Sequence, residues 1–297
     1  MEDNGLIKYY KNFKRGRDLT NPKLHDGFSF GMVRTKSDEL QACLTTPEGS
    51  YYVKTADKKQ RDAEVLLSQV YAKAGLKSAI YLPAGHISKY RCVVSNDIAK
   101  KENIVIAKDY FSDIRSKVLN GVTFDSNTIA CNSFYMPQKK ENAQVDYQKY
   151  ITPDAMRNLQ KARAFDLASF NIDRHHLNYF LKTQGDLVTD VILIDHAMSG
   201  EIFKNRNLVN DWLELSMYYS EFFYGKHFKD EIISSFKTNE VVQDFITPQE
   251  LAESLGSVDI LDTARDIRGT IGYKINQEYV DCIAKSFDDT ADQLMQH

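Results

Sequence analysis

The sequence contains few cysteines and none of the spacings that cysteine-based sites need. Its four cysteines, Cys43, Cys92, Cys131 and Cys282, are far apart and form no Cys-x-x-Cys pair. This pattern indicates neither a zinc site nor a disulfide framework. We therefore expect buried or free thiols in a reducing compartment.

Long apolar runs and an excess of charge of one sign are also absent. No stretch of about 18 apolar residues occurs, and the amino terminus has no apolar run followed by a small-residue cleavage site. The 38 basic and 41 acidic residues give a formal net charge of -3, which favours neither nucleic acid nor an anionic membrane. We expect a soluble, cytoplasmic protein without a nucleic-acid partner or stable membrane insertion; its oligomeric state is left open.

What the chain does have is enough apolar sequence for a large core and a β-rich beginning. Of its 297 residues, 42% are hydrophobic, which is typical of a folded protein. Residues 40–44 alternate as in a strand, residues 46–49 read as a turn, and residues 51–55 read as the returning strand. This hairpin carries Lys54 near its end.

A helix is expected directly after the hairpin. Apolar residues recur at helical spacing between Ala63 and Ala74, and Gly75 stands at a C-cap position. Glu64 lies at the edge of that apolar stripe. Further short strands are expected at residues 78–82, 90–94 and 103–107.

The rest of the chain has mainly helical patterns. Thr152 and Pro153 predict the start of a helix that runs towards Phe170, with threonine as N-cap. A capping box predicts another helix after Thr247. Aromatic residues at helical spacing between residues 212 and 223, ended by Gly225, are expected in the core rather than at a membrane or ligand surface. An exposed loop is expected at residues 138–148.

This order of elements predicts an α+β protein with two lobes. We place the boundary near Lys108, so that residues 1–107 form a small β-rich N-lobe and residues 108–297 a larger helical C-lobe. A cleft between two lobes is a common place for a ligand.

Two polar segments stand beside predicted buried strands. In residues 171–181, Asp173 and Asn178 belong to a polar loop followed by the apolar Tyr-Phe-Leu of a strand. Shortly after, four aliphatic residues lead directly to Asp195. The alternative explanation of the first segment is a loop that its own Asp and Asn side chains stabilise by hydrogen bonds to the backbone. The alternative explanation of Asp195 is a helix or turn cap that follows a strand.

Phosphoryl transfer from ATP needs a carboxylate that orients or deprotonates the acceptor hydroxyl, and oxygen ligands for Mg²⁺. Asp173 has the first role in this hypothesis, and Asn178 and Asp195 the second. Lys54 can hold the α- and β-phosphates, and Glu64 can fix the lysine by an ion pair. The alternatives are an exposed strand lysine at Lys54 and a solvated helix residue at Glu64.

The segment Asp173-Arg174-His175-His176-Leu177-Asn178, followed by Ile194-Asp195-His196, resembles the kinase-superfamily branch of the phosphatidylinositol 3- and 4-kinases, HipA toxins and HipA-like protein kinases. The resemblance spans roughly residues 27 to 200 and implies a two-lobed kinase-like fold that uses ATP and Mg²⁺. It also implies that His175 assists catalysis or contacts phosphate. His176 is more typical of a structural residue, and Arg174 of one that braces the loop.

The same resemblance implies further nucleotide contacts. The best phosphate loop is residues 27–37, with Gly31 for close backbone approach and Ser29 as an ATP contact, although it lacks the G-x-G-x-x-G spacing. Ser29 and Ser37 are possible counterparts of a regulatory autophosphorylated serine. Residues 106–110 are assigned as the hinge from their position between the predicted lobes alone, and Ala107 and Asp109 are expected to contact adenine there. In a departure from the usual metal motif, His196 and Ala197 replace Phe-Gly.

The resulting functional hypothesis is a kinase that phosphorylates serine or threonine of a protein substrate. One alternative keeps the fold but takes a phosphoinositide or small hydroxyl compound as acceptor; Lys204 and Arg206 could then meet an anionic headgroup. Another is a catalytically silent kinase-like binding module.

Overall fold

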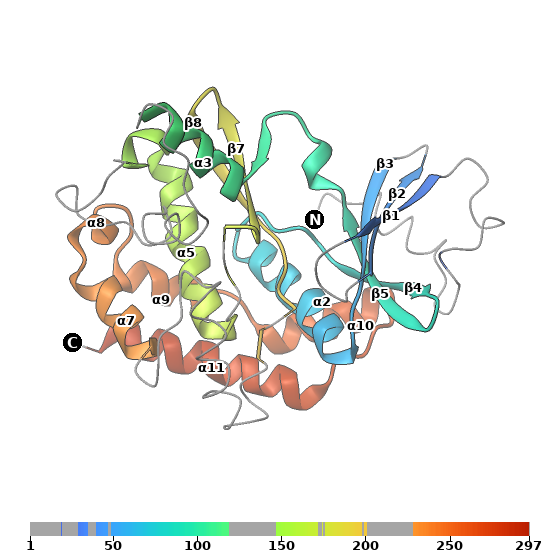
Figure 1. Ribbon diagram of the computed structural model, residues 1–297. Coiled ribbons are helices and arrows are strands. Elements are labelled where there is room, and N and C mark those ends of the chain that lie inside the picture. Colours follow the sequence, from blue (N-terminus) through green and yellow to red (C-terminus); the bar gives the residue numbers. More distant parts are fainter. Residues whose placement is uncertain are drawn as a thin grey trace.

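The computed structural model describes residues 19, 29–34, 40–46, 49–118, 147–171, 174, 176–197, 199–200 and 228–296. Within these residues the chain is α+β, as predicted. A small antiparallel sheet with one helix forms the N-terminal part, and helices dominate the C-terminal part (Figure 1).

The N-terminal part is built on a five-stranded antiparallel sheet with the order β1-β2-β3-β5-β4. Its strands are β1 (Ser29–Arg34), β2 (Leu40–Thr46), β3 (Gly49–Thr55), β4 (Leu82–Ile87) and β5 (Tyr90–Asn96). The predicted hairpin is confirmed, since β2 pairs with β3 and Gln41 lies opposite Lys54. Because β3 lies between β2 and β5, an interior strand carries Lys54.

The predicted helix after the hairpin is α2 (Lys58–Lys73), and local chemistry sets its ends. The Asp57 side chain accepts from the Gln60 N–H, and the Gln60 side chain accepts from the Asp57 N–H, which is a capping box. After the C-cap Ala74, Gly75 has a φ of +79°, a conformation that glycine adopts without strain. The helix packs against β4 and β5.

A second, three-stranded antiparallel sheet has the order β6-β7-β8. It consists of β6 (Ile104–Ile106), β7 (Tyr179–Gln184) and β8 (Leu187–Leu193). The strands predicted beside the two polar segments are confirmed as β7 and β8. Although β6 precedes the boundary predicted near Lys108, it pairs with β7; the division into lobes at that residue stays a prediction.

Two helices begin where capping residues predicted them. At α5 (Pro153–Ser169) the Thr152 side chain accepts from the Ala155 N–H. At α9 (Pro248–Gly256) Thr247 and Glu250 form a capping box. The other α-helices that follow α2 in the described part of the chain are α3 (Ala107–Val118), α7 (Phe228–Thr238), α8 (Glu240–Gln243), α10 (Ile260–Ile271) and α11 (Gln277–Met295).

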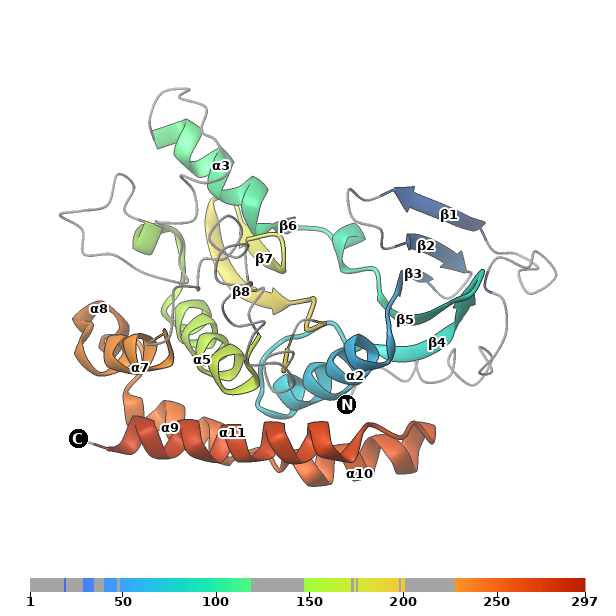
Figure 2. The ribbon, with the colours of Figure 1, turned by 60° about the horizontal axis from the view of Figure 1, so that its bottom comes forward.

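The C-terminal helices run beneath both parts of the molecule. In Figure 2, α11 passes under α5 with α10 at its side, and α10 contacts α2. A large apolar core joins α2, α3 and α5 to β7, β8 and these helices, and a smaller one lies on the opposite face of the five-stranded sheet. Val93 belongs to the large core and its neighbours Cys92 and Val94 to the small one, because successive side chains of a strand point to opposite faces.

Two strand predictions are wrong in their extent. In the segment predicted as a strand at residues 78–82, Ser78 makes an isolated bridge to Leu193, and the strand itself starts at Leu82. That strand contains Pro83, which reads as a turn residue but is tolerated because β4 lies at the sheet edge. The strand predicted at residues 103–107 covers only 104–106.

Some predictions fall outside the described residues. These are the aromatic face at 212–223, most of the loop at 138–148, Cys131, Ser37, Lys204 and Arg206. Among the described residues, Cys43, Cys92 and Cys282 take part in no disulfide bond. No helix in the described part of the chain has the length and apolar character needed to cross a membrane.

Candidate functional site

The site is built around Lys54, near the end of β3. Its side chain is only 4% exposed, and its ammonium lies 2.8 Å from the Asp195 carboxylate, 141 residues away in sequence. The same ammonium pairs with Glu64 of α2 and lies 5.2 Å from the centroid of the Tyr81 ring. The alternatives of an exposed Lys54 and a solvated Glu64 are therefore wrong, because both side chains are buried in one ion-paired cluster.

Glu64 is fully buried and uses both of its carboxylate oxygens. One oxygen pairs with Lys54, and the other accepts a hydrogen bond of 3.0 Å from the backbone N–H of His196. Glu64 thus links α2 to β3 and also to the residue that follows Asp195.

One cation here serves two carboxylates, and this sets their protonation. Burial raises the pKa of Glu64 to about 7, with Asp195 also raising it and Lys54 lowering it. Burial acts to lower the pKa of Lys54, but Asp195 and Glu64 raise it well above its ordinary value. Burial acts to raise the pKa of Asp195, but Lys54 holds it well below its usual range. Lys54 and Asp195 are therefore charged at neutral pH.

Asp195 follows β8 in an unusual backbone conformation. Its φ is +57°, a left-handed value at which a residue other than glycine is strained by roughly 1–3 kcal/mol. The chain just before it is fixed, because the Leu193 N–H donates to Lys77 and its carbonyl accepts from the Ala79 N–H, both at 2.9 Å. The Asp195 side chain is 32% exposed, so β8 presents a carboxylate that a ligand can reach.

Asn178 lies directly before β7 and beside the segment that carries Asp195. Its carbonyl accepts from the Ile194 N–H at 3.2 Å, and its side chain is largely buried. The structure thus brings Asn178 close to the Lys54, Glu64 and Asp195 cluster through backbone pairing. Asp173 and His175 lie outside the described residues, so their predicted catalytic roles stay predictions.

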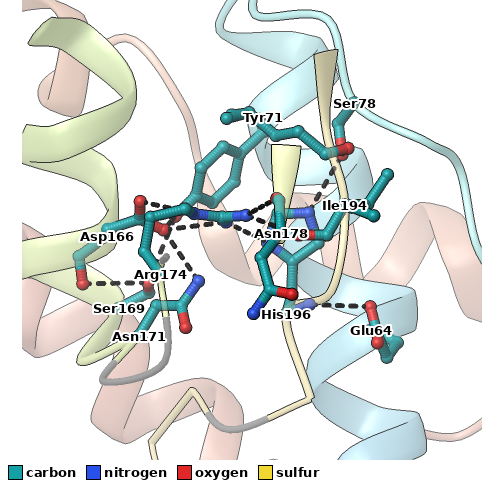
Figure 3. A network of polar contacts seen from close by, with 11 residues as sticks. Glu64, Tyr71, Ser78, Asp166, Ser169, Asn171, Arg174, Asn178, Ile194 and His196 are labelled. Atoms are coloured by element: carbon teal, nitrogen blue, oxygen red, sulfur yellow. Dashed lines mark hydrogen bonds and ion pairs between the residues drawn. The ribbon is translucent and has the colours of Figure 1, made fainter. Parts of the chain in front are cut away.

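A fully buried guanidinium, that of Arg174, connects this segment to α5 (Figure 3). Its Nε and Nη2 donate to the two carboxylate oxygens of Asp166 at 2.9 and 3.0 Å. Its Nη1 donates to the carbonyls of Asn178 and Ile194, and Nη2 donates to His196 Nδ1 at 3.3 Å. Arg174 therefore braces the loop, as expected, and all five of its N–H groups have acceptors.

The Asp166 carboxylate also ties α2 to this network. It accepts from the Tyr71 hydroxyl at 2.7 Å and from the Asn171 side-chain amide at 2.8 Å. Tyr71 lies on α2, two turns after Glu64, so one helix contacts both the ion-paired cluster and the Arg174 network.

His196 is buried as a neutral imidazole. Because arginine can only donate, Nδ1 must accept from Arg174, and the ring proton therefore sits on Nε2, 3.0 Å from the Ser78 hydroxyl. Burial, with the Arg174 charge, keeps the pKa of His196 well below 6.5. Its ring also lies 4.7 Å, between centroids, from that of Tyr71.

The sequence prediction missed Tyr71, Asp166 and His196 as parts of this site. His196 was noted only as a departure from Phe-Gly. The one local signal is that Tyr71 shares a helix face with Glu64; the partners of Asp166 and His196 come from other elements, so no local pattern indicates them.

The predicted phosphate loop needs correction. Ser29 and Gly31 lie in β1, where they pair with Thr45 and Cys43 of β2, so the middle of residues 27–37 is a strand. The alternating sequence Ser-Phe-Gly-Met-Val-Arg finds a partner strand in β2, and this pairing takes precedence over the loop that the two glycines suggested. Residues 35–39, between β1 and β2, are outside the described part.

The segment predicted to contact adenine is the start of a helix. Ala107 is the first residue of α3 and is fully buried, and Asp109 lies in the first turn. The Lys108 N–H donates to the His176 carbonyl at 2.9 Å, so this amide already has an acceptor. Nothing in this geometry supports a nucleotide contact at Ala107 or Asp109, and their assignment stays a prediction.

The donor set is suited to a hard cation. A carboxylate from Asp195 and an amide oxygen from Asn178, completed by phosphate oxygens and water, are the ligands Mg²⁺ prefers. Among the described residues, no group of three or more His, Cys, Asp or Glu gathers as a ready-made metal cage.

No protein-family model and no curated protein matches the sequence. Among solved structures, the chain is similar to the Helicobacter pylori proinflammatory kinase CtkA, with 12% identity, 85% of this chain and 90% of that chain covered, and a TM-score of 0.49. It is also similar to Shewanella oneidensis HipA in complex with HipB and operator DNA (12% identity, 95% and 65% covered, TM-score 0.42) and to Streptococcus pneumoniae choline kinase LicA (14%, 91% and 94%, 0.29).

At these identities and TM-scores the likenesses do not support conclusions about activity or substrate. The architecture itself is α+β, with a small antiparallel sheet and one helix followed by a larger, mainly helical part. The function must be inferred from the site.

Proposed function

We propose that the protein is an ATP-dependent phosphotransferase that uses Mg²⁺. The observation that carries this proposal is the buried Lys54 ammonium, held between Glu64 of α2 and the partly exposed Asp195 that follows β8. Phosphoryl transfer needs a fixed cation for the nucleotide phosphates next to a carboxylate that can bind Mg²⁺, and this arrangement suits both requirements.

Each residue has a defined task in this proposal. Lys54 binds the α- and β-phosphates, and Glu64 keeps the lysine in place. Asn178 and Asp195 hold Mg²⁺, which neutralises charge on the phosphates when bound. Asp173 orients the acceptor hydroxyl and accepts its proton, and His175 contacts phosphate. The last two assignments rest on the resemblance of the sequence motif.

The acceptor we propose is a serine or threonine of a protein. This choice rests on the resemblance to the HipA-like branch, and membership of that branch is part of the proposal. The same chemistry could serve a phosphoinositide or a small hydroxyl compound, so the test includes these acceptors.

The test incubates the purified protein with Mg²⁺ and γ-labelled ATP in four arms: alone, with casein, with phosphoinositide vesicles, and with choline. We expect label on serine or threonine in the first two arms. Label on lipid alone, or on choline alone, would show that the acceptor is that compound and not a protein hydroxyl. Nucleotide binding without transfer in every arm would indicate a silent module, and no binding would contradict the proposal.

The matched variant is Asp173→Asn. Because the amide cannot accept the acceptor's proton, we expect transfer to be abolished while folding and binding of Mg²⁺-ATP stay near the wild-type level. Calorimetric titration measures the binding. If the variant kept most of its transfer activity, Asp173 would not be the base.

A further inference from the structure

Arg174 reaches both segments that carry the proposed Mg²⁺ ligands, without itself lying where a ligand could touch it. It is fully buried, and its Nη1 donates at once to the carbonyl of Asn178 and to that of Ile194, the residue before Asp195. Figure 3 shows these carbonyls side by side at the guanidinium. One planar group thus spans the start of β7 and the end of β8.

Resting on the proposed function, we propose that Arg174 is a positioning residue that sets the spacing between the Asn178 and Asp195 side chains, and thereby the affinity for the metal–nucleotide complex. The strand pairing of β7 with β8 does not fix this spacing, because β8 ends at Leu193 and the paired residues stop there. Past that point, the Ile194 N–H to Asn178 carbonyl bond and the Arg174 guanidinium join the two segments.

The guanidinium can fix this spacing because it is itself anchored. Two N–H groups bind the two oxygens of Asp166, which α5 carries, and Tyr71 and Asn171 hold the same carboxylate from other directions. A planar donor with a two-point anchor cannot rotate, so its other N–H groups have fixed directions.

The residue after Asp195 is fixed by the same group. His196 is held at Nδ1 by Arg174, at Nε2 by Ser78 and at its backbone N–H by Glu64. Hydrogen bonds thus hold Ile194 and His196, the residues on either side of Asp195. The left-handed backbone of Asp195 is therefore fixed at both ends. Arg174 contacts both flanking residues and therefore controls where the carboxylate points.

Lysine at position 174 separates charge from geometry. It keeps the positive charge beside Asp166 but has three N–H donors where arginine has five, and no plane. The control is Arg163→Lys, because Arg163 is an equally buried arginine that contacts α7, through the Ser235 hydroxyl at 3.4 Å and the Phe236 ring at 4.8 Å.

The experiment titrates Mg²⁺ into protein saturated with a non-hydrolysable ATP analogue and follows the melting temperature. For Arg174→Lys we expect the Mg²⁺ midpoint to rise roughly 10–100-fold, the usual effect of changing a group that orients metal ligands, while metal-free binding of the analogue persists. Arg163→Lys should melt at a lower temperature but keep the wild-type midpoint.

A wild-type midpoint in Arg174→Lys would overturn the positioning role alone and leave the proposed function intact. If the wild type itself bound the analogue without any Mg²⁺ dependence, the proposed function would fail and the positioning role with it. Should Arg174→Lys not fold, Asp166→Asn serves instead, because it leaves Arg174 in place but removes the charge that orients it. A raised midpoint there supports the proposal, and a wild-type midpoint overturns it.

Discussion

At the scale of single residues, the main feature of the site is an imbalance of charge. One buried cation, Lys54, faces the two carboxylates of Glu64 and Asp195, and Asp195 is the more exposed of the two. The exposed carboxylate keeps its charge, whereas the fully buried one has a pKa of about 7. A Mg²⁺ ion bound at Asp195 would neutralise part of the charge of its carboxylate. Lys54 would then interact mainly with Glu64 and the nucleotide phosphates.

This imbalance predicts an effect of pH on stability. The pKa of Glu64 is about 7 in the native protein and 4.5 ordinarily, so the native state holds this proton more tightly than the unfolded state. The resulting stabilisation is complete below about pH 4.5 and is lost as the pH rises through 7. Relative to Glu64→Gln, which does not titrate, the wild type should lose up to about 3 kcal/mol of unfolding free energy between pH 4.5 and 8.

Urea denaturation of both proteins at about pH 5 and about pH 8 measures this difference. Other ionisable groups titrate in both proteins, so the change in the difference between them isolates Glu64. A difference that does not change with pH would show that Glu64 remains ionised throughout.

The residues of the cluster could be predicted because each has a local signature. Lys54 lies near the end of an apolar strand, Asp195 follows another, and Glu64 lies on a helix with a clear apolar stripe. The network around Arg174 could not be predicted in the same way. Its acceptors lie 8, 4, 20 and 22 residues away and are backbone carbonyls as well as side chains, and a sequence does not show which carbonyls will converge.

At the scale of elements, α2 is fixed from both sides. One side carries Glu64 and Tyr71, which contact the site. On another, Asp62 is buried and accepts from the Tyr273 hydroxyl at 2.8 Å and from the Asn276 N–H at 3.1 Å, in the connection between α10 and α11. Since α2 sets the position of Glu64, this attachment holds the Lys54 pair together from the C-terminal end of the chain.

Breaking that attachment should loosen α2. Asp62→Ala leaves the Tyr273 hydroxyl and the Asn276 N–H without their acceptor, which costs roughly 1–3 kcal/mol of unfolding free energy. Hydrogen exchange of α2 amides should become faster. Tyr273→Phe, which removes one donor and leaves Asp62 paired, is the control and should have a smaller effect. Unchanged exchange in Asp62→Ala would show that the sheet alone fixes α2.

Helix starts were predictable and strand limits were less so, for a physical reason. The N-caps at Thr152 and Thr247 act within three residues, so the sequence contains the whole interaction. The limits of β4 depend on its partner β5 and on its place at the sheet edge, where Pro83 is accommodated and the register shifts between Pro83 and His86. Likewise, the sequence of β1 alone does not indicate a strand, because its pairing with β2 is what makes it one.

At the scale of the whole molecule, the site depends on segments from most of the chain. The large apolar core is continuous from α2 through α5 to α11, so the N-terminal helix and the C-terminal helices share one packed interior (Figure 2). The α+β order of elements could be predicted from the sequence, but this support from α10 and α11 could not, because their sequences indicate only that they are helical.

The central claim is that Lys54, Asn178 and Asp195 hold a metal–nucleotide complex. Isothermal titration of a non-hydrolysable ATP analogue into wild type and Asp195→Asn, each with Mg²⁺ and with EDTA, tests it most directly. We predict that Mg²⁺ strengthens binding to the wild type by at least about tenfold, or about 1.4 kcal/mol, and that this gain disappears in Asp195→Asn while metal-free binding remains. An equal gain from Mg²⁺ in both proteins would contradict the account.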